Sequence, residues 1–335
     1  MINFRYHVVS LTAVFLALAV GLVLGSTVLN GPMLDALENR VNTLGRDNSQ
    51  LREQVSFLEE EVDREQEFAA EAAPMLLAGL LTGQRVQLLV LPGGEDYVAG
   101  VSQALELSDA TLTGTVVLTD RFTHPQHRLG ELLDLAHRVI PDSVDADSLP
   151  ANSDGVETSA ALLAAVLYAP TGTADAVDPQ DPDGTAAGQA EESDGEPIPA
   201  QDRSAVLSAY AAADYLVQEV PVQGAADLVV VVAGLPESDH DADQRNEALL
   251  TTIAQFQQAG PVAVVASGVA GDGNVVAEVR SDPQLAAAIT TVDNASTPQG
   301  QTAAAMAAAW HLSGNVGHFG IGAGAERRLP DLTAR

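Results

Sequence analysis

Hydrophobic residues recur every three or four positions between residues 34 and 72, which is the heptad spacing of a left-handed coiled coil. Valine dominates one core position of the repeat and leucine the other, a combination that favours two parallel helices. A single asparagine in the valine series, Asn48, can hydrogen-bond to its counterpart in a dimer and penalises other registers. The predicted interface consists of Leu34, Leu37, Val41, Leu44, Asn48, Leu51, Val55, Leu58 and Val62. We therefore expect a parallel homodimer through a coiled coil at residues 33–73, with one amphipathic helix packed on a globular domain as the alternative.

An apolar run at residues 8–29 precedes this repeat and carries no charged side chain. Its length suffices to cross a bilayer, which takes about 20 residues. A secretory signal peptide is the alternative, but its apolar region is shorter and ends at a small-residue cleavage site. We expect an uncleaved single-pass anchor in the plasma membrane. Arg5 lies in the head, residues 1–7, and Asp35 and Glu38 follow the run, so the charge bias places the head in the cytoplasm and the C-terminal domain outside.

Proline and glycine mark the predicted boundaries of the coil. Asn30-Gly31-Pro32 is expected to separate it from the membrane span, because this tripeptide is typical of a helix start. Pro74 is expected to end the coil. Residues 75–81 would then form a short apolar helix that packs on the following domain.

The pattern changes to short apolar runs between helical segments after Pro74. Runs without alternation predict strands that are buried on both faces of a parallel sheet. The strands are expected at residues 86–91, 113–118, 227–232, 262–267 and 288–293. Helices are expected between them, among others at residues 127–140, 156–168 and 299–312. This order predicts the α/β class, with one Rossmann-like, doubly wound domain at residues 74–170 and 203–325 and a tail at 326–335.

Residues 171–202 interrupt the domain with a segment rich in Asp, Glu, Gly and Pro. Such a composition buries too little apolar surface to offset the entropy of ordering, so it predicts a disordered acidic insertion.

Charge and composition exclude several function classes. The formal net charge of −31 argues against nucleic acid and anionic lipid surfaces as partners. All basic residues are arginine, so no lysine is present to bind a phosphate, and there is neither a G-x-x-x-x-G-K nor a G-x-S-x-G motif. Without cysteine the chain forms no disulfide and offers no thiolate. We expect no enzymatic activity.

Histidines supply the candidate metal ligands. His124 and His127 flank Pro125 in a loop, and His240 lies in a carboxylate-rich loop. Imidazole suits Cu(II) or Zn, whereas Cu(I) prefers thiolate or thioether, and the chain has no methionine-rich run. The alternative is that both loops are merely solvated. We expect no cofactor, and bound copper is the alternative.

The carboxyl ends of the predicted strands are the other place to expect a ligand. They carry Pro92-Gly93-Gly94, Asp120-Arg121, Gly234, Ser267-Gly268 and Asp293-Asn294. Asp120, Asp293 and His318 are the candidates for a convergent acid–base group, although no motif fixes their geometry.

The head FRYHVVSL and the tail VGHFG are the most distinctive short segments. Together with one span, a heptad coil and an α/β domain, they resemble the actinobacterial MctB copper transporter family over nearly the whole chain except the acidic insertion. The resemblance implies copper efflux or homeostasis, and the outer membrane of a mycolate envelope as the alternative location. The family is also similar to SteB, a partner of the membrane protein SteA in cell separation, which implies a coil that engages a peptidoglycan hydrolase at the septum. The resemblance brings no metal-binding or catalytic residues.

One span per chain encloses no aqueous pore unless many chains assemble, and the alternating strands of an outer-membrane barrel are absent from the sequence pattern. From the sequence we therefore favour an adaptor in septal cell-wall remodelling, which binds another membrane protein and a peptidoglycan hydrolase. Copper transport is the alternative function, and an extracytoplasmic ligand-binding sensor is the further one.

Overall fold

The computed structural model describes residues 4–125, 130–151, 154–168, 198–236 and 240–332, without the side chains of residues 26–35. The chain forms two compact units, residues 1–65 and residues 66–335.

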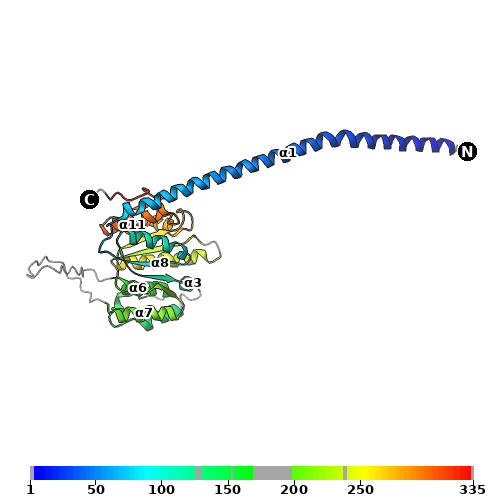
Figure 1. Cartoon of the computed structure of the whole chain (residues 1–335). Helices are drawn as coiled ribbons and strands as arrows, with labels where there is room; N and C mark the ends of the chain where they lie inside the picture. Colours follow the sequence, from blue (N-terminus) through cyan, green and yellow to red (C-terminus); the bar gives the residue numbers. More distant parts are fainter. Residues whose placement is uncertain (1–3, 126–129, 152–153, 169–197, 237–239, 333–335) are drawn as a thin grey trace, which may run out of the picture. The chain divides into compact units, whose positions relative to one another are not determined.

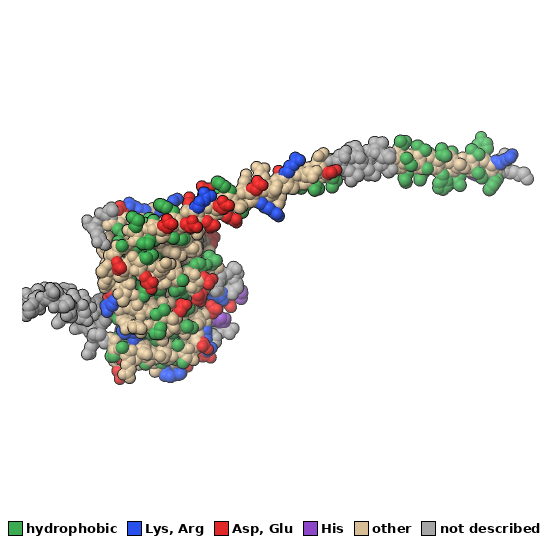
Figure 2. Space-filling view, viewed as in Figure 1, with side chains coloured by type: hydrophobic (Ala, Val, Ile, Leu, Met, Phe, Trp, Pro, Cys, Tyr) green, Lys and Arg blue, Asp and Glu red, His purple; other side chains and the backbone are tan. Residues whose placement is uncertain are grey.

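One helix, α1 (Phe4–Leu77), makes up the described part of the first unit and supplies the start of the second (Figure 1). Its stretch Phe4–Gly25 has a mean hydropathy of 2.5, and within the described ranges it is the one helix long and apolar enough to cross a membrane. Figure 2 shows apolar side chains gathered on this N-terminal part of α1. The prediction of one apolar N-terminal helix is confirmed.

The predicted helix boundaries at two prolines are wrong. α1 continues through Asn30-Gly31-Pro32 and ends three residues beyond Pro74, at Leu77. A proline removes one backbone hydrogen bond and can kink a helix without ending it. Leucine, alanine and glutamate, which favour helix, flank both sites. Residues 75–81 are therefore not a separate helix but the end of α1 and the turn that follows it.

The second unit is built on a seven-stranded sheet with the order β3-β2-β1-β4-β5-β6-β7. Neighbouring strands are parallel except β2 and β3, which are antiparallel. The strands are β1 (Arg85–Val90), β2 (Thr111–Leu118), β3 (Leu216–Val220), β4 (Leu228–Ala233), β5 (Val262–Ala266), β6 (Thr290–Val292) and β7 (His318–Phe319).

Helices connect these strands and cover both faces of the sheet (Figure 1). They are α2 (Glu95–Leu107), α3 (Asp120–Thr123), α5 (Glu131–Val139), α6 (Gly155–Leu167), α7 (Ala200–Ala212), α8 (Ala242–Ala259), α9 (Val275–Ser281), α10 (Pro283–Ala288) and α11 (Pro298–Leu312), with a 3₁₀ turn, η1, at Ala146–Ser148.

Two hydrophobic cores lie on opposite faces of the sheet, because successive side chains of a strand alternate in direction. Val229 and Val231 of β4 belong to the core under α5 to α9. Val230 and Val232 belong to the core under α2 and α11, which also takes in the end of α1. Strands buried on both faces read as continuous apolar runs, which is why β1, β2, β4 and β5 were predictable.

The predicted α/β class with a mainly parallel sheet is confirmed. The five predicted strands correspond to β1, β2, β4, β5 and β6, whereas β3 and β7 were not predicted.

The ends of the predicted insertion and tail need correction. Residues 171–197 lie outside the described residues, but α7 begins at Ala200, before the predicted boundary at 203. The Ser143 hydroxyl donates a hydrogen bond to the Asp202 carboxylate at 2.6 Å, which ties this end to the domain. The domain also extends past residue 325, because the Glu326 N–H donates to the carbonyl of His318 at 2.8 Å.

Candidate functional site

The predicted histidine ligands do not form a metal cluster within the described ranges. His124 follows α3 directly and is partly buried, and His240 is an exposed turn residue just before α8. His127 lies outside the described residues. In the part of the chain that the structure describes, no three His, Asp or Glu side chains gather closely enough to hold a metal ion.

A cavity lies at the carboxyl ends of β1 and β4, two adjacent parallel strands from which the chain leaves toward opposite sides of the sheet. This is the switch point at which open α/β sheets bind ligands. We call it the carboxyl-edge cavity. Its volume is about 60 Å³, enough for a few water molecules or a small organic group. Its floor and rim come from the loops after β1 and β4, from the first turns of α8, and from α3 and α9.

Glycines allow the two loops under the cavity to approach each other closely. A Cβ atom on Gly234, after β4, would overlap the backbone of Gly93, after β1. The structure therefore brings together two of the predicted strand ends, Pro92-Gly93-Gly94 and Gly234. A larger residue at position 234 would fit only if the loop moved.

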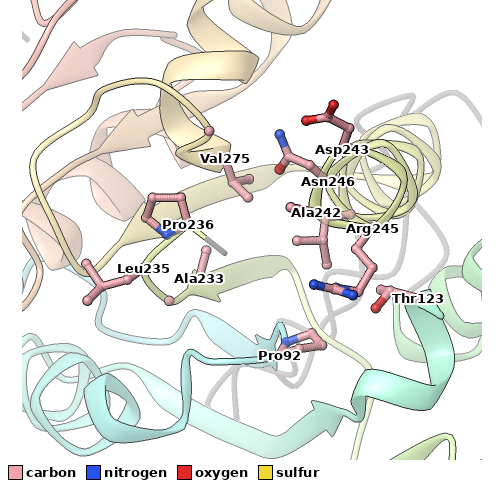
Figure 3. Close-up of a pocket in the computed structure, with 13 residues that line it drawn as sticks. Pro92, Thr123, Ala233, Leu235, Pro236, Ala242, Asp243, Arg245, Asn246 and Val275 are labelled. Atoms are coloured by element: carbon pink, nitrogen blue, oxygen red, sulfur yellow. The ribbon is translucent and has the colours of Figure 1, made fainter. Parts of the chain in front are cut away.

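Both polar and apolar side chains line this cavity. The polar side chains are Thr123, Asp243, Arg245 and Asn246. The larger apolar ones are Pro92, Leu235, Pro236, Leu249 and Val275. Figure 3 shows the guanidinium of Arg245 pointing toward Pro92 and Thr123, and the carboxylate of Asp243 turned away from it. Neither α8 nor α9 was assigned residue bounds from the sequence, so no signal pointed to Arg245 in advance.

The predicted acid–base group does not converge. Asp120 follows β2 and Asp293 follows β6, and these strands lie four positions apart in the sheet, about 19 Å at the usual strand spacing. Arg121 beside Asp120 instead pairs with Glu131 at 2.7 Å and lies over the ring of Tyr215 at 5.1 Å.

Asp293 belongs to a buried ion pair, which we call the tail clamp. Its carboxylate lies 2.8 Å from a guanidinium nitrogen of Arg280 in α9, and the two side chains are 0% and 4% exposed. Asp293 also accepts hydrogen bonds from the backbone N–H groups of Ile321 at 2.8 Å and Gly322 at 3.1 Å. Arg280 donates to the Phe319 carbonyl at 2.7 Å. Both charges are therefore satisfied, and the pair holds the chain that follows β7 against β6.

The tail clamp explains the glycine-rich tail. Gly320 has a φ of +128°, and a Cβ there would overlap the Asp293 carboxylate. Phe319 packs edge-on against Trp310, the one tryptophan of the chain, with 6.3 Å between ring centroids. The VGHFG segment thus has a packing role, and nothing in its geometry requires a ligand.

Two partly buried histidines, His311 and His318, lie near the tail clamp. Nδ1 of His311 is hydrogen-bonded to the hydroxyl of Thr290 at 2.9 Å. Nδ1 of His318 is hydrogen-bonded to the hydroxyl of Thr291, also at 2.9 Å. Burial lowers the pKa of both imidazoles below the ordinary value of 6.5, and Arg280 lowers the pKa of His318 further.

Acid should therefore weaken the domain. In the unfolded chain both histidines bind protons as the pH falls through about 6.5, whereas the folded chain resists protonation, so the unfolded state binds more protons. Stability is retained above that pH and is lost as the pH falls toward the folded pKa values. We expect the melting midpoint, followed by Trp310 fluorescence, to fall between about pH 7.5 and about pH 5.5. The fall should shrink in His311→Gln/His318→Gln and persist in His137→Gln, a change on the exposed side of α5. A wild-type midpoint that is equal at both pH values would refute this account.

The predicted interface on α1 is exposed within one chain. Leu37, Leu44 and Val62 are 58%, 67% and 49% exposed, whereas Leu34 is among the residues whose side chains are not described. Near the end of α1, Ala73 and Leu77 pack on the domain and are 7% and 0% exposed, whereas Leu76, which continues the heptad row, is 50% exposed. The coil predicted at residues 33–73 and the dimer through it both stay predictions.

Comparison with known proteins identifies relatives over the whole length. A family model described as "Copper transport outer membrane protein, MctB" matches residues 1–330. A protein named "Copper transporter MctB" from Mycobacterium tuberculosis (strain CDC 1551 / Oshkosh) is 28% identical over 337 residues, which cover 97% of this chain and 98% of the relative. The protein of the same name from Mycobacterium leprae (strain TN) is 29% identical over 344 residues, with the same shares covered.

Proposed function

This chain belongs to the MctB family of copper transport outer membrane proteins, and on that premise we propose that it is a membrane-anchored protein of the cell envelope that acts in copper transport. The observation that carries the proposal is the extent of the match, which includes the apolar helix, the coil region and the α/β domain. Relatives that are similar over 97% of the chain are named copper transporters. This favours the copper alternative over the septal adaptor that the sequence alone suggested.

The anchor is the stretch Phe4–Gly25 of α1. The charge bias supports a cytoplasmic head and an external domain. The family description names an outer membrane protein, which supports the mycolate outer membrane as the location. The cytoplasmic head applies only to an anchor in the plasma membrane.

A single span cannot line an aqueous path by itself, so the copper role needs several chains or another membrane protein. The exposed apolar row from Leu37 to Val62 supports self-association in parallel. The chain has no cysteine and four methionines, so it lacks the thiolates that hold Cu(I) tightly. We therefore propose that it acts as a non-enzymatic component of a copper pathway and does not store the metal.

Growth under metal challenge tests the copper role. A strain that lacks this chain should be inhibited by a severalfold lower copper concentration than its parent, with zinc tolerance unchanged. The wild-type chain should restore tolerance. Leu16→Arg/Val20→Arg should not, because each charge at the centre of the span costs about 2.5–3.5 kcal/mol, whereas the matched Leu16→Ala/Val20→Ala should. Equal copper tolerance with and without the chain would reject the proposal.

A further inference from the structure

Three exposed apolar side chains lie in a row at the carboxyl edge of the sheet. They are Leu235 after β4, Val269 after β5 and Ile321 after β7, which are 62%, 52% and 55% exposed. We call this row the edge ridge. A single exposed apolar residue needs no explanation, whereas a contiguous group of them marks an interaction surface.

The three loops that carry the edge ridge touch one another. Gly268 and Ala270 lie on either side of the middle ridge residue in the chain. A Cβ atom on Gly268 would lie 3.0 Å from Cδ2 of Leu235. A Cβ atom on Gly322, which follows the third ridge residue, would overlap Ala270. The ridge is therefore one surface, and because β4 and β7 are three positions apart in the sheet, it spans about 14 Å at the usual strand spacing.

Opposite charges lie at the two ends of the edge ridge. Arg328 lines the same surface hollow as Ile321, at the β7 end. Asp272 precedes Gly273, on which a Cβ atom would lie 3.3 Å from Pro236, at the β4 end. Both charged side chains are exposed, and neither has an ion-pair partner in the part of the chain that the structure describes.

Arg328 is the charge of its segment that lies nearest this edge. Arg327 pairs with Phe319 in a parallel bridge, so Arg328 lies one residue closer to the carboxyl edge, and Glu326 lies one residue farther from it, beside β7. The Arg327 guanidinium is paired with Asp331 at 3.6 Å. The ridge is thus apolar along its length, with a cation at one end and a carboxylate at the other.

A second copy of this chain is the partner that this charge pattern fits. A ridge turned by half a turn places Leu235 of one copy on Ile321 of the other. Val269, near the middle, then meets Val269 of the other copy, and Asp272 meets Arg328 at both ends. The net charge of −31 repels two copies elsewhere on their surfaces, which favours the one arrangement that sets a cation against a carboxylate.

We propose that two copies of this chain associate through the edge ridge, in a two-fold symmetric contact that pairs Arg328 with Asp272. The ridge offers a few hundred Å² of apolar area, against about 800 Å² per partner in a standard interface. The contact is therefore weak in dilute solution and forms where the membrane anchor concentrates the chains. It uses no residue of the apolar row on α1, so the two surfaces together would link more than two chains. It does not rest on the copper role.

Disulfide cross-linking tests this contact, because the chain has no cysteine of its own. The full chain is reconstituted at high density in phosphatidylcholine liposomes and oxidised with diamide. Val269→Cys should form a covalent dimer, because residues near a two-fold axis approach within the roughly 7 Å between Cα atoms that a disulfide allows. The matched control is Val217→Cys, which is 53% exposed on β3 at the far edge of the sheet. Cross-linking should be at least about tenfold faster at position 269.

Charge variants test the pairing of the two ends. Arg328→Glu places like charges against each other and should slow the cross-linking of Val269→Cys severalfold, whereas Asp272→Arg/Arg328→Glu exchanges the charges and should restore it. A second cysteine pair keeps the test valid if Val269→Cys fails to fold. Leu235→Cys/Ile321→Cys should also give covalent dimers, because the two positions are about 14 Å apart within one chain, too far for an internal disulfide.

Two results would overturn the proposal. One is an equal rate of cross-linking in Val269→Cys and Val217→Cys, which would leave the edge ridge as a surface for a different protein. The other is a rate that Arg328→Glu leaves unchanged.

Discussion

Replacement of Arg280 by methionine is expected to lower the free energy of unfolding by about 3–5 kcal/mol, because it leaves the Asp293 carboxylate buried without its counter-charge. Asp293 is fully buried and would keep only the N–H groups of Ile321 and Gly322 as partners. Methionine replaces the aliphatic part of the arginine side chain, which limits the loss of packing. The end of β7 would lose the guanidinium bond to the Phe319 carbonyl as well.

Trp310 provides the readout for this loss. Its ring contacts Phe319, whose carbonyl the tail clamp holds, so its fluorescence follows the unfolding of this edge in urea. The matched control is Arg327→Met, which removes an exposed pair with Asp331 at 3.6 Å and should cost less than about 1 kcal/mol. Equal losses of unfolding free energy in the two variants would show that the tail clamp does not hold the tail in place.

The second large effect is expected in the apolar row of α1. The double variant Leu44→Asp/Leu51→Asp should convert a dimer of the full chain into a monomer. In a parallel coil each substitution acts twice, so four leucines of the interface are lost, and burial of one leucine contributes about 1.5–3 kcal/mol. Dimerisation should weaken at least about a thousandfold. Light scattering coupled to size exclusion, corrected for detergent, measures the mass.

A control variant must distinguish the effect of the added charge on dimerisation from the effect of losing the apolar interface. Thr43→Asp/Gln50→Asp adds the same two charges at outer positions of the heptads and should leave the dimer intact. A wild-type chain with the mass of one subunit would end the coiled-coil hypothesis. It would leave the row from Leu37 to Val62 as a surface for a different protein.

Continuous apolar runs made most of the sheet predictable. β4, with six buried residues in succession, could hardly be anything but a central strand. β3 has the mixed sequence LVQEV and buries only its first residue, because it is an antiparallel edge strand with one neighbour. β7 has two residues and depends on the tail clamp, so no local pattern reveals it.

The candidate site was predictable only in part. The sequence marked Pro92-Gly93-Gly94 and Gly234 as strand ends, but it did not show that their strands are neighbours, since the segments between β1 and β4 are long and include β2 and β3. Arg245 lies on α8, for which no residue bounds were predicted and whose N-cap residue, Asp241, makes no capping hydrogen bond. Asp293 was identified as a chemical candidate, yet its partner Arg280 comes from a helix whose bounds the sequence did not give.

Cell-associated copper, measured by mass spectrometry under copper challenge, tests the central claim most directly. The comparison uses a strain without this chain, rescued with wild type, with Leu44→Asp/Leu51→Asp or with Thr43→Asp/Gln50→Asp. A role in outward copper transport by the anchored, assembled chain predicts that copper rises on deletion and that wild type and the outer-position variant restore it, whereas the interface variant does not. Unchanged copper after deletion would contradict the copper role and return septal cell-wall remodelling as the function to test.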